Sequence, residues 1–168
     1  EAIGVIGPSG SGKSSLARAL TGVWPLSTGK IKLDGAPLEQ YSPEVLAQYI
    51  GYLPQRVTLF DGTVAENIAR LAKDFDHEAV ITAAMKAAAH DMILKLPKGY
   101  NTQVQTIGTQ LSGGQIQRIG LARALYGDVR LVVLDEPDAS LDEAGLNALL
   151  RAIQELKRRK VTTIVVSH

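Results

Sequence analysis

The sequence Gly7-Pro8-Ser9-Gly10-Ser11-Gly12-Lys13-Ser14, followed by Ser15, stands between a short apolar run at residues 3–6 and a stretch typical of a helix at residues 14–20. Its glycines permit backbone angles that expose consecutive N–H groups to an anion. The helix that follows directs the positive end of its dipole at the same place. A strand, a glycine-rich loop and a helix in this order predict a phosphate-binding loop in an α/β protein.

Two side chains give this loop its chemistry. Lys13 adds a compact positive charge for the β and γ phosphates of a nucleotide, and the hydroxyl of Ser14 is a ligand for Mg²⁺. The alternative is a glycine-rich turn that carries a lysine by chance. The strand before the loop and the helix after it lie where the motif requires them, so the phosphate site is favoured.

The stretch Val132-Val133-Leu134-Asp135-Glu136 is an apolar strand that ends in two carboxylates. Ligands of α/β sheets bind at the carboxyl ends of the strands, so Asp135 is predicted to hold the magnesium ion. Glu136 is a candidate base, or a residue that orients the attacking water. Side chains alternate along an extended chain, so Glu136 is expected to face away from Asp135. An exposed acidic strand end is the alternative.

A third feature, Leu111-Ser112-Gly113-Gly114-Gln115, opens an amphipathic stretch and is typical of a helix N-terminus that receives an anion. One nucleotide needs only one phosphate loop, and residues 7–14 already supply it. The second anion-binding end therefore predicts that another copy of the protein completes the site.

Composition limits the remaining possibilities. The 168 residues suffice for one domain, or for most of a slightly larger one. A formal net charge of +1 argues against a nucleic-acid partner held by bulk electrostatics. The absence of cysteine excludes disulfides, thiol nucleophiles and thiolate metal sites. No apolar run is long enough to span a membrane, and both ends of the chain are expected to be cut within strands.

The rest of the chain alternates between strand and helix patterns. A half-exposed strand with a following turn is predicted at residues 30–35, a helix capped by Ser42, and a strand at residues 49–53. Residues 63–126 are predominantly helical and are read as an insertion into the sheet domain. A long helix follows Asp142, and the residues predicted on its buried face are Leu146, Leu149, Leu150, Ile153 and Leu156.

With the three motifs in this order, the chain resembles the nucleotide-binding domain of ATP-binding cassette (ABC) transporters over essentially all of its length. The resemblance implies a P-loop NTPase (RecA-like) fold, in which a parallel sheet core carries an α-helical subdomain at about residues 63–126. It also implies that residues 1–168 are an excerpt. The start of the N-terminal β-subdomain, with the aromatic residue that stacks on adenine, and the C-terminal end would lie outside it.

The resemblance assigns further roles by matching position. Gln55 is similar to the Q-loop glutamine, which touches magnesium. Residues 112–115 would bind the γ-phosphate of ATP held by a second nucleotide-binding domain. Glu136 matches the catalytic glutamate, and Asp142 belongs to the D-loop that crosses the dimer interface. His168 matches the switch histidine, which contacts the γ-phosphate. The implied ligands are ATP and Mg²⁺.

Residues 60–68 look like a segment of exporters, which implies contact with coupling helices of a transmembrane domain. The alternative is a capped helix with a packed phenylalanine. Tyr100-Asn101-Thr102 and Gly108 also match exporter spacing, whereas Gln105-Thr106 departs from the usual Gly-Glu. Within exporters the chain looks most like the ATPase part of type I secretion systems, which move polypeptides. That implies a place at the cytoplasmic face of a membrane, the bacterial inner membrane.

Other classes of protein remain as alternatives. A soluble cassette ATPase of chromosomes or DNA repair would carry a very long coiled coil before residue 111, and no sustained heptads occur there. A translation-associated cassette protein is disfavoured by residues 60–68. A P-loop kinase leaves residues 111–115 unexplained. The basic run at residues 157–160 is read as a solvated helix end rather than a nucleic-acid patch.

Overall fold

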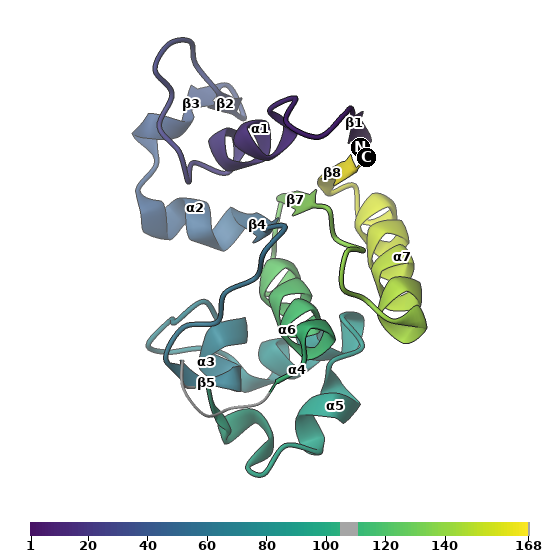
Figure 1. The fold of residues 1–168 in the computed structure, drawn as a ribbon. Coiled ribbons are helices and arrows are strands. Elements are labelled where there is room, and N and C mark those ends of the chain that lie inside the picture. The colour runs from purple at the N-terminus through teal and green to yellow at the C-terminus, as the bar shows by residue number, and fades with distance from the viewer. Residues whose placement is uncertain (105–110, 168) are drawn as a thin grey trace.

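The computed structural model of the chain describes residues 1–104 and 111–167 (Figure 1). In chain order the elements are β1 (Ala2–Ile6), α1 (Lys13–Leu20), β2 (Lys32–Leu33), β3 (Ala36–Pro37), η1 (Leu38–Gln40), α2 (Pro43–Tyr49), β4 (Ile50–Leu53), β5 (Gly62–Thr63), α3 (Val64–Ile68), α4 (His77–Lys86), α5 (His90–Leu94), η2 (Gly99–Asn101), β6 (Gln103–Val104), α6 (Gly113–Leu125), β7 (Leu131–Asp135), α7 (Glu143–Arg158) and β8 (Thr162–Ser167).

The main sheet has the order β1-β8-β7-β4, and all its neighbouring strands are parallel. Side chains alternate across it. Leu131 and Val133 of β7 pack with Ala17 of α1 on one face. Val132 and Leu134 pack on the other face, with buried side chains of α6 and α7. β7 is buried along its whole length, as expected for a central strand covered on both sides. The predicted α/β fold with a parallel sheet is confirmed.

The structure differs from the sequence-based expectations in two places. Gly62–Thr63 pairs antiparallel with Gln103–Val104, a short ladder that no sequence pattern indicated. The predicted buried face of α7 is wrong in part, because Leu146 and Leu150 are 41% and 51% exposed. The helix instead turns small residues inward, which allows its backbone to approach the sheet closely; the buried residues are Gly145, Ala148, Leu149, Ala152 and Leu156.

The predominantly helical stretch of residues 63–126 contains α3 to α6. Figure 1 shows α3, α4 and α5 together below the sheet, with α6 leading from them toward β4. At its C-terminal end α6 lies so near to β4 that a Cβ on Gly51 would be 2.0 Å from the carbonyl oxygen of Ala124. Glycine at position 51 therefore allows α6 to join the helical stretch to the sheet.

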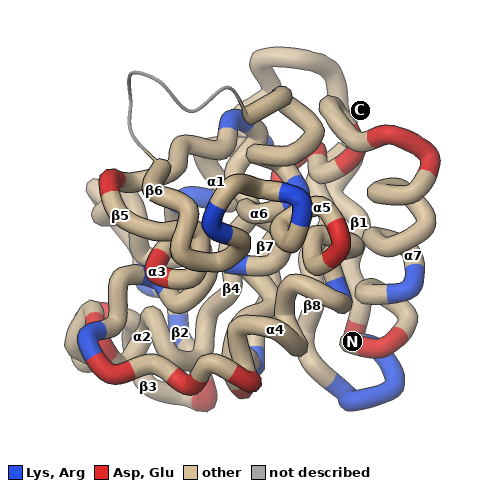
Figure 2. Tube along the Cα trace, turned by 90° about the horizontal axis from the view of Figure 1, so that it is seen from below, with Lys and Arg blue, Asp and Glu red and all other residues tan. Residues whose placement is uncertain are grey.

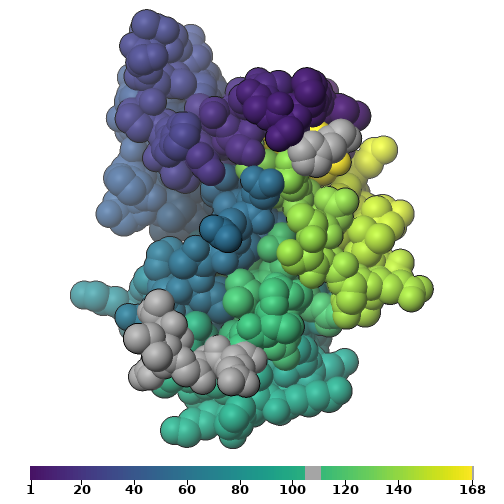
Figure 3. Space-filling view, in the orientation of Figure 1, coloured from purple at the N-terminus to yellow at the C-terminus, as the bar shows by residue number. Residues whose placement is uncertain are grey.

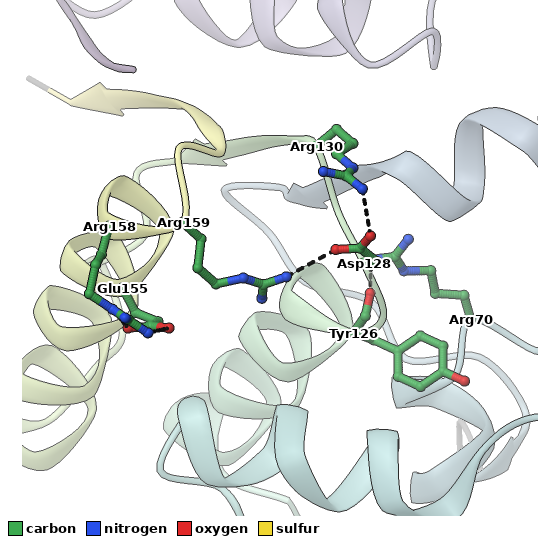
Figure 4. Close-up of polar contacts among 7 residues, drawn as sticks. All are labelled: Arg70, Tyr126, Asp128, Arg130, Glu155, Arg158 and Arg159. Atoms are coloured by element: carbon green, nitrogen blue, oxygen red, sulfur yellow. Dashed lines mark hydrogen bonds and ion pairs between the residues drawn. The ribbon is translucent and has the colours of Figure 1, made fainter.

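A partly buried arginine fills the junction between these parts. Arg70, directly after α3, has a left-handed backbone (φ 60°) and points its guanidinium at the C-terminal turn of α6 (Figure 4). Burial lowers the pKa of Arg70 to about 10. Since this value is still well above neutral pH, the guanidinium stays protonated. All five of its acceptors are backbone carbonyl oxygens, those of Ala47, Ile50, Arg123, Ala124 and Tyr126. The cation thus neutralises the negative end of the α6 dipole without an acidic partner.

Charged residues elsewhere are interspersed (Figure 2). Asp128 accepts hydrogen bonds from Arg130 at 2.8 Å and from Arg159 at 2.9 Å (Figure 4). Arg158 pairs with Glu155 at 2.8 Å. Two members of the basic run at residues 157–160 are therefore paired with carboxylates, which supports its interpretation as a helix end. None of the helices in the described ranges combines the length and the apolar character needed to cross a membrane.

Replacement of Arg70 tests its role at the junction. We expect Arg70→Gln to lower the free energy of unfolding by about 2–4 kcal/mol, because several buried carbonyls lose their donor. Chemical denaturation with a fit of the free energy in water measures this. Arg158→Gln is the control, since it removes the same charge from an exposed pair and should cost much less. Equal losses in the two variants would show that Arg70 is an ordinary surface arginine.

Candidate functional site

The predicted phosphate loop connects β1 to α1. Gly10 and Gly12 have φ angles of 79° and 90°, which favour glycine because other residues are strained there. Gly12 is the N-cap of α1, and no side chain caps this helix. The N–H groups of its first turn therefore depend on water or a ligand for hydrogen bonds. A helix that begins in this way is suited to bind an anion.

Lys13 is folded over the loop. Its Nζ atom donates to the carbonyl oxygens of Gly7 at 2.6 Å and Pro8 at 3.0 Å. The side chain is buried, although a lysine in the first turn of a helix opposes the helix dipole. Acidic residues are absent from that turn. A bound anion would remove this electrostatic conflict, and the loop oxygens hold the cation until then.

Ser14 and Asp135 meet where α1 faces the end of β7. The hydroxyl of Ser14 donates to Oδ1 of Asp135 at 3.2 Å. Asp135 is completely buried, and its Oδ2 atom lacks a hydrogen-bond partner among the described residues. A buried carboxylate oxygen without a partner carries a large desolvation cost, which a cation would offset. Hydroxyl and carboxylate oxygens are the donors that magnesium prefers, so the two residues fit that ion.

Gln55 and Glu136 close the site from the neighbouring strands. Nε2 of Gln55 donates to Oε2 of Glu136 at 2.5 Å. Glu136 has φ 48°, a left-handed conformation that costs free energy in a residue with a side chain. The expectation that the alternation of side chains along a strand sets the direction of Glu136 is wrong, because β7 ends at Asp135 and Glu136 lies in a turn. Its N–H donates to the carbonyl oxygen of Val166 in β8, at 3.0 Å.

These residues surround one cavity of about 230 Å³, lined by Ser9, Gly10, Gly12, Lys13, Ser14, Ser15, Gln55 and Glu136. Three separate stretches of sequence thus meet at the carboxyl edge of the sheet, as predicted. Larger cavities exist elsewhere, but no residue of the glycine loop lines them. No sequence pattern indicated that Tyr52 lies near the site. It packs on the α1 side of the sheet, where burial and the nearby Asp135 carboxylate raise its pKa.

The second anion motif lies at the start of α6, as predicted, and forms a capping box there. Ser112 Oγ accepts the N–H of Gln115 at 3.3 Å, while Gln115 Oε1 accepts the N–H of Ser112 at 2.8 Å. Ser112 and Gly113 are exposed. None of residues 112–115 lines the cavity at the glycine loop. Figure 3 shows both regions on one face, the loop in dark purple at the top and the start of α6 in green below.

Asp142 does not line the cavity. It caps α7, where its Oδ1 atom accepts the N–H of Gly145 at 2.9 Å and also pairs with Arg118. These two hydrogen bonds, the Gly145 bond first, lower the pKa of Asp142. The sequence did not indicate Arg118 as a site residue, but only as part of the helix that is α6 in the structure. His168, Gln105-Thr106 and Gly108 lie outside the described residues.

Comparison with known proteins gives consistent matches. A family model described as "ABC transporter" matches residues 1–139. The "Type I secretion system ATP-binding protein PrsD" of Rhizobium meliloti (strain 1021) is 54% identical over 167 residues, which are 99% of this chain and 29% of that protein. The "ATP-dependent lipid A-core flippase" of Legionella pneumophila (strain Paris) is 41% identical over 166 residues, 99% of this chain and 28% of the flippase.

A solved structure agrees with these sequence matches. The "Structure of a bacterial Atm1-family ABC exporter with ATP bound" has a TM-score of 0.85 and 33% sequence identity, and the match covers 99% of this chain and 29% of that one. The chain therefore spans less than a third of the length of these relatives. Their titles name a secretion protein, a flippase and an exporter, which favours the exporter interpretation over the soluble alternatives. Since the family model covers the glycine loop, the strand-end carboxylates and the Ser112 capping box, the chain belongs to the ABC transporter family.

Proposed function

We propose that this chain is the nucleotide-binding part of an exporter, and that it binds and hydrolyses ATP to drive transport across a membrane. One observation carries the proposal. The hydroxyl of Ser14 lies 3.2 Å from a wholly buried Asp135, and within the described ranges the second oxygen of Asp135 lacks a partner and the adjacent helix end lacks a side-chain cap. A cation together with a polyphosphate is the ligand that satisfies both groups.

In this proposal the loop residues Gly7, Pro8, Ser9, Gly10, Ser11, Gly12, Lys13, Ser14 and Ser15 hold the phosphates. Lys13 turns from its two carbonyl acceptors to the β and γ phosphates. Ser14 and Asp135 would hold Mg²⁺, with Gln55 at its edge; the ion would neutralise phosphate charge in the transition state. Among the described residues no three acidic or histidine side chains cluster as metal ligands. That suits an ion that keeps waters and phosphate oxygens as ligands.

Glu136 is proposed as the residue that accepts a proton from the attacking water or orients that water. Its strained turn directs the carboxylate into the cavity of the phosphate loop. Gln55 donates to one oxygen of this carboxylate at 2.5 Å. His168 is proposed to contact the γ-phosphate, on the strength of the family resemblance.

A second copy or a paralogue would complete the site. The exposed helix start at residues 112–115 does not line the cavity of its own chain, which supports its use on a nucleotide held by a partner. Two chains would then close head to tail around two ATP molecules, with Asp142 near the interface. Only the γ-phosphate reaches the second helix, so ATP stabilises the closed state more than ADP does, and hydrolysis reopens the pair.

The setting of the chain is proposed from its relatives. Residues 63–126 would form the helical subdomain, and residues 60–68 would face coupling helices of a transmembrane domain. This arrangement puts the chain at the cytoplasmic face of a membrane, the bacterial inner membrane, without a nucleic-acid partner. Identity of 54% with a type I secretion ATP-binding protein supports a polypeptide as the transported substrate.

Removal of the loop cation should weaken nucleotide binding. We expect Lys13→Ala to raise the Kd for Mg·ATP roughly 10- to 100-fold, because charge-assisted hydrogen bonds to phosphate are lost. Titration with a fluorescent ATP analogue measures the change. The control is Lys32→Ala, which removes an exposed lysine from β2 and should bind ATP normally. An unchanged Kd for Lys13→Ala would contradict the phosphate-loop assignment.

Neutralising Glu136 should separate binding from hydrolysis. Glu136→Gln keeps an oxygen that can accept the Gln55 hydrogen bond, but it cannot take a proton from water. We expect hydrolysis to fall about 100-fold or more, with ATP still bound. Light scattering after gel filtration should then find a dimer at saturating Mg·ATP. A Glu136→Gln protein that remains monomeric under these conditions would count against the closed-pair scheme.

A bulky residue at the second motif should block the partner's nucleotide only. We expect Ser112→Arg to abolish hydrolysis while the ATP affinity of a single chain changes little. Ser42→Arg is a matched control, because Ser42 caps α2 with the same kind of hydrogen bond, to Val45 N–H at 3.4 Å. That variant should keep its activity. A large loss of ATP affinity in Ser112→Arg would mean that residues 112–115 act on their own chain's nucleotide.

A further inference from the structure

The first turns of α6 are fastened to the segment that follows Glu136. At Gly114 the approach is close, because a Cβ there would lie 3.1 Å from the carbonyl oxygen of Ser140. The buried side chain of Gln117 donates to the carbonyl oxygen of Pro137 at 3.5 Å. One residue further, Arg118 forms an ion pair with Asp142. Together the three contacts are distributed along residues 137–142, the whole length of the segment.

Arg118 is the strongest of these links. Its guanidinium reaches two elements besides α6: one nitrogen donates to Ala88 O at 3.0 Å, just past α4, and the other donates to Asp142 at the start of α7. The Arg118 side chain is 15% exposed and its partner Asp142 is 65% exposed, whereas Arg130 and Asp128 are 66% and 60% exposed. A shielded guanidinium with two acceptors holds its geometry better than an arginine in a pair with both partners exposed.

The segment between Glu136 and Asp142 is short and internally bonded. The N–H of Ala139 donates to Glu136 O at 3.3 Å, and the N–H of Leu141 donates to Asp138 O at 3.2 Å. Leu141 also packs against the main core. These bonds and the packing of Leu141 connect Asp142 to Glu136 within one short segment.

We propose that Arg118 is a positioning residue for hydrolysis, which fixes the candidate catalytic Glu136 relative to the start of α6 through Asp142. The proposal rests on the proposed function. In that scheme residues 112–115 meet the partner's nucleotide, and Glu136 acts on the nucleotide of its own chain. Arg118 then links the two reaction sites within one chain. It touches neither nucleotide, so its effect falls on the rate of hydrolysis and not on ATP affinity.

A double-mutant cycle in the full-length protein tests this role. Arg118→Ala removes the guanidinium and both of its hydrogen bonds. Asp142→Asn removes the negative charge of Asp142, while asparagine can still cap α7. We expect each variant to lower kcat for ATP hydrolysis about tenfold, and the double variant to be no slower than either one. The Kd for a fluorescent ATP analogue should stay within about twofold, as for a residue that does not touch nucleotide. The same cycle on Arg130→Ala and Asp128→Asn should leave kcat unchanged.

The possible results distinguish a failure of the positioning role of Arg118 from a failure of the proposed function. Arg118→Lys keeps the positive charge but not the two-pronged guanidinium. A partial recovery of kcat relative to Arg118→Ala supports the proposed positioning role of Arg118. If Arg118→Ala does not fold, Arg118→Lys replaces it in the cycle. Additive losses of kcat, or an unchanged kcat in Arg118→Ala, would overturn the role of Arg118 while ATP hydrolysis by the wild type stands. A wild-type protein that neither binds nor hydrolyses ATP would overturn both proposals.

Discussion

The start of α1 is the constraint on which the rest of the site depends. This helix begins at a left-handed Gly12 without a side-chain cap, and a buried lysine occupies its first turn. Both features oppose stability in the isolated chain, since unpaired N–H groups and a cation lie at the positive end of the helix dipole. A bound anion at that point would offset both. The central strand β7 places Asp135 opposite the same helix turn, where the hydroxyl of Ser14 donates to its carboxylate.

Much of this arrangement could be predicted from the sequence because its causes are local. The glycine loop, the apolar strand ending in Asp135 and the helix start at Ser112 each depend on a few neighbouring residues, and the structure contains each of these local features. The carboxyl ends of parallel strands meet at one edge, which brings distant motifs together without further information. The direction of Glu136 could not be predicted, because it depends on where β7 ends and on a turn held by Val166 of another strand.

The failures share a physical origin in tertiary packing. Leu146 and Leu150 fit the helical period, but small residues on the neighbouring stripe let α7 approach the sheet and turn these leucines outward. Nothing in the sequence marked Arg70 or Arg118 as structural residues. In the structure Arg70 donates to carbonyl oxygens of the last turn of α6, whereas Arg118, which belongs to α6, donates to Ala88 O and pairs with Asp142. Two arginines thus determine how the helix that carries the second motif sits between the sheet and the smaller helices.

The hydrogen bond from Gln55 to Glu136 joins the ends of two neighbouring strands, because Gln55 follows β4 and Glu136 follows β7. Both side chains line the cavity at the glycine loop. Under the proposed function, Gln55 lies at the edge of the magnesium ion, and Glu136 accepts a proton from the attacking water or orients that water. A shift of Gln55 on binding of the ion would then also move Glu136, so that metal binding and alignment of the water become one coupled event.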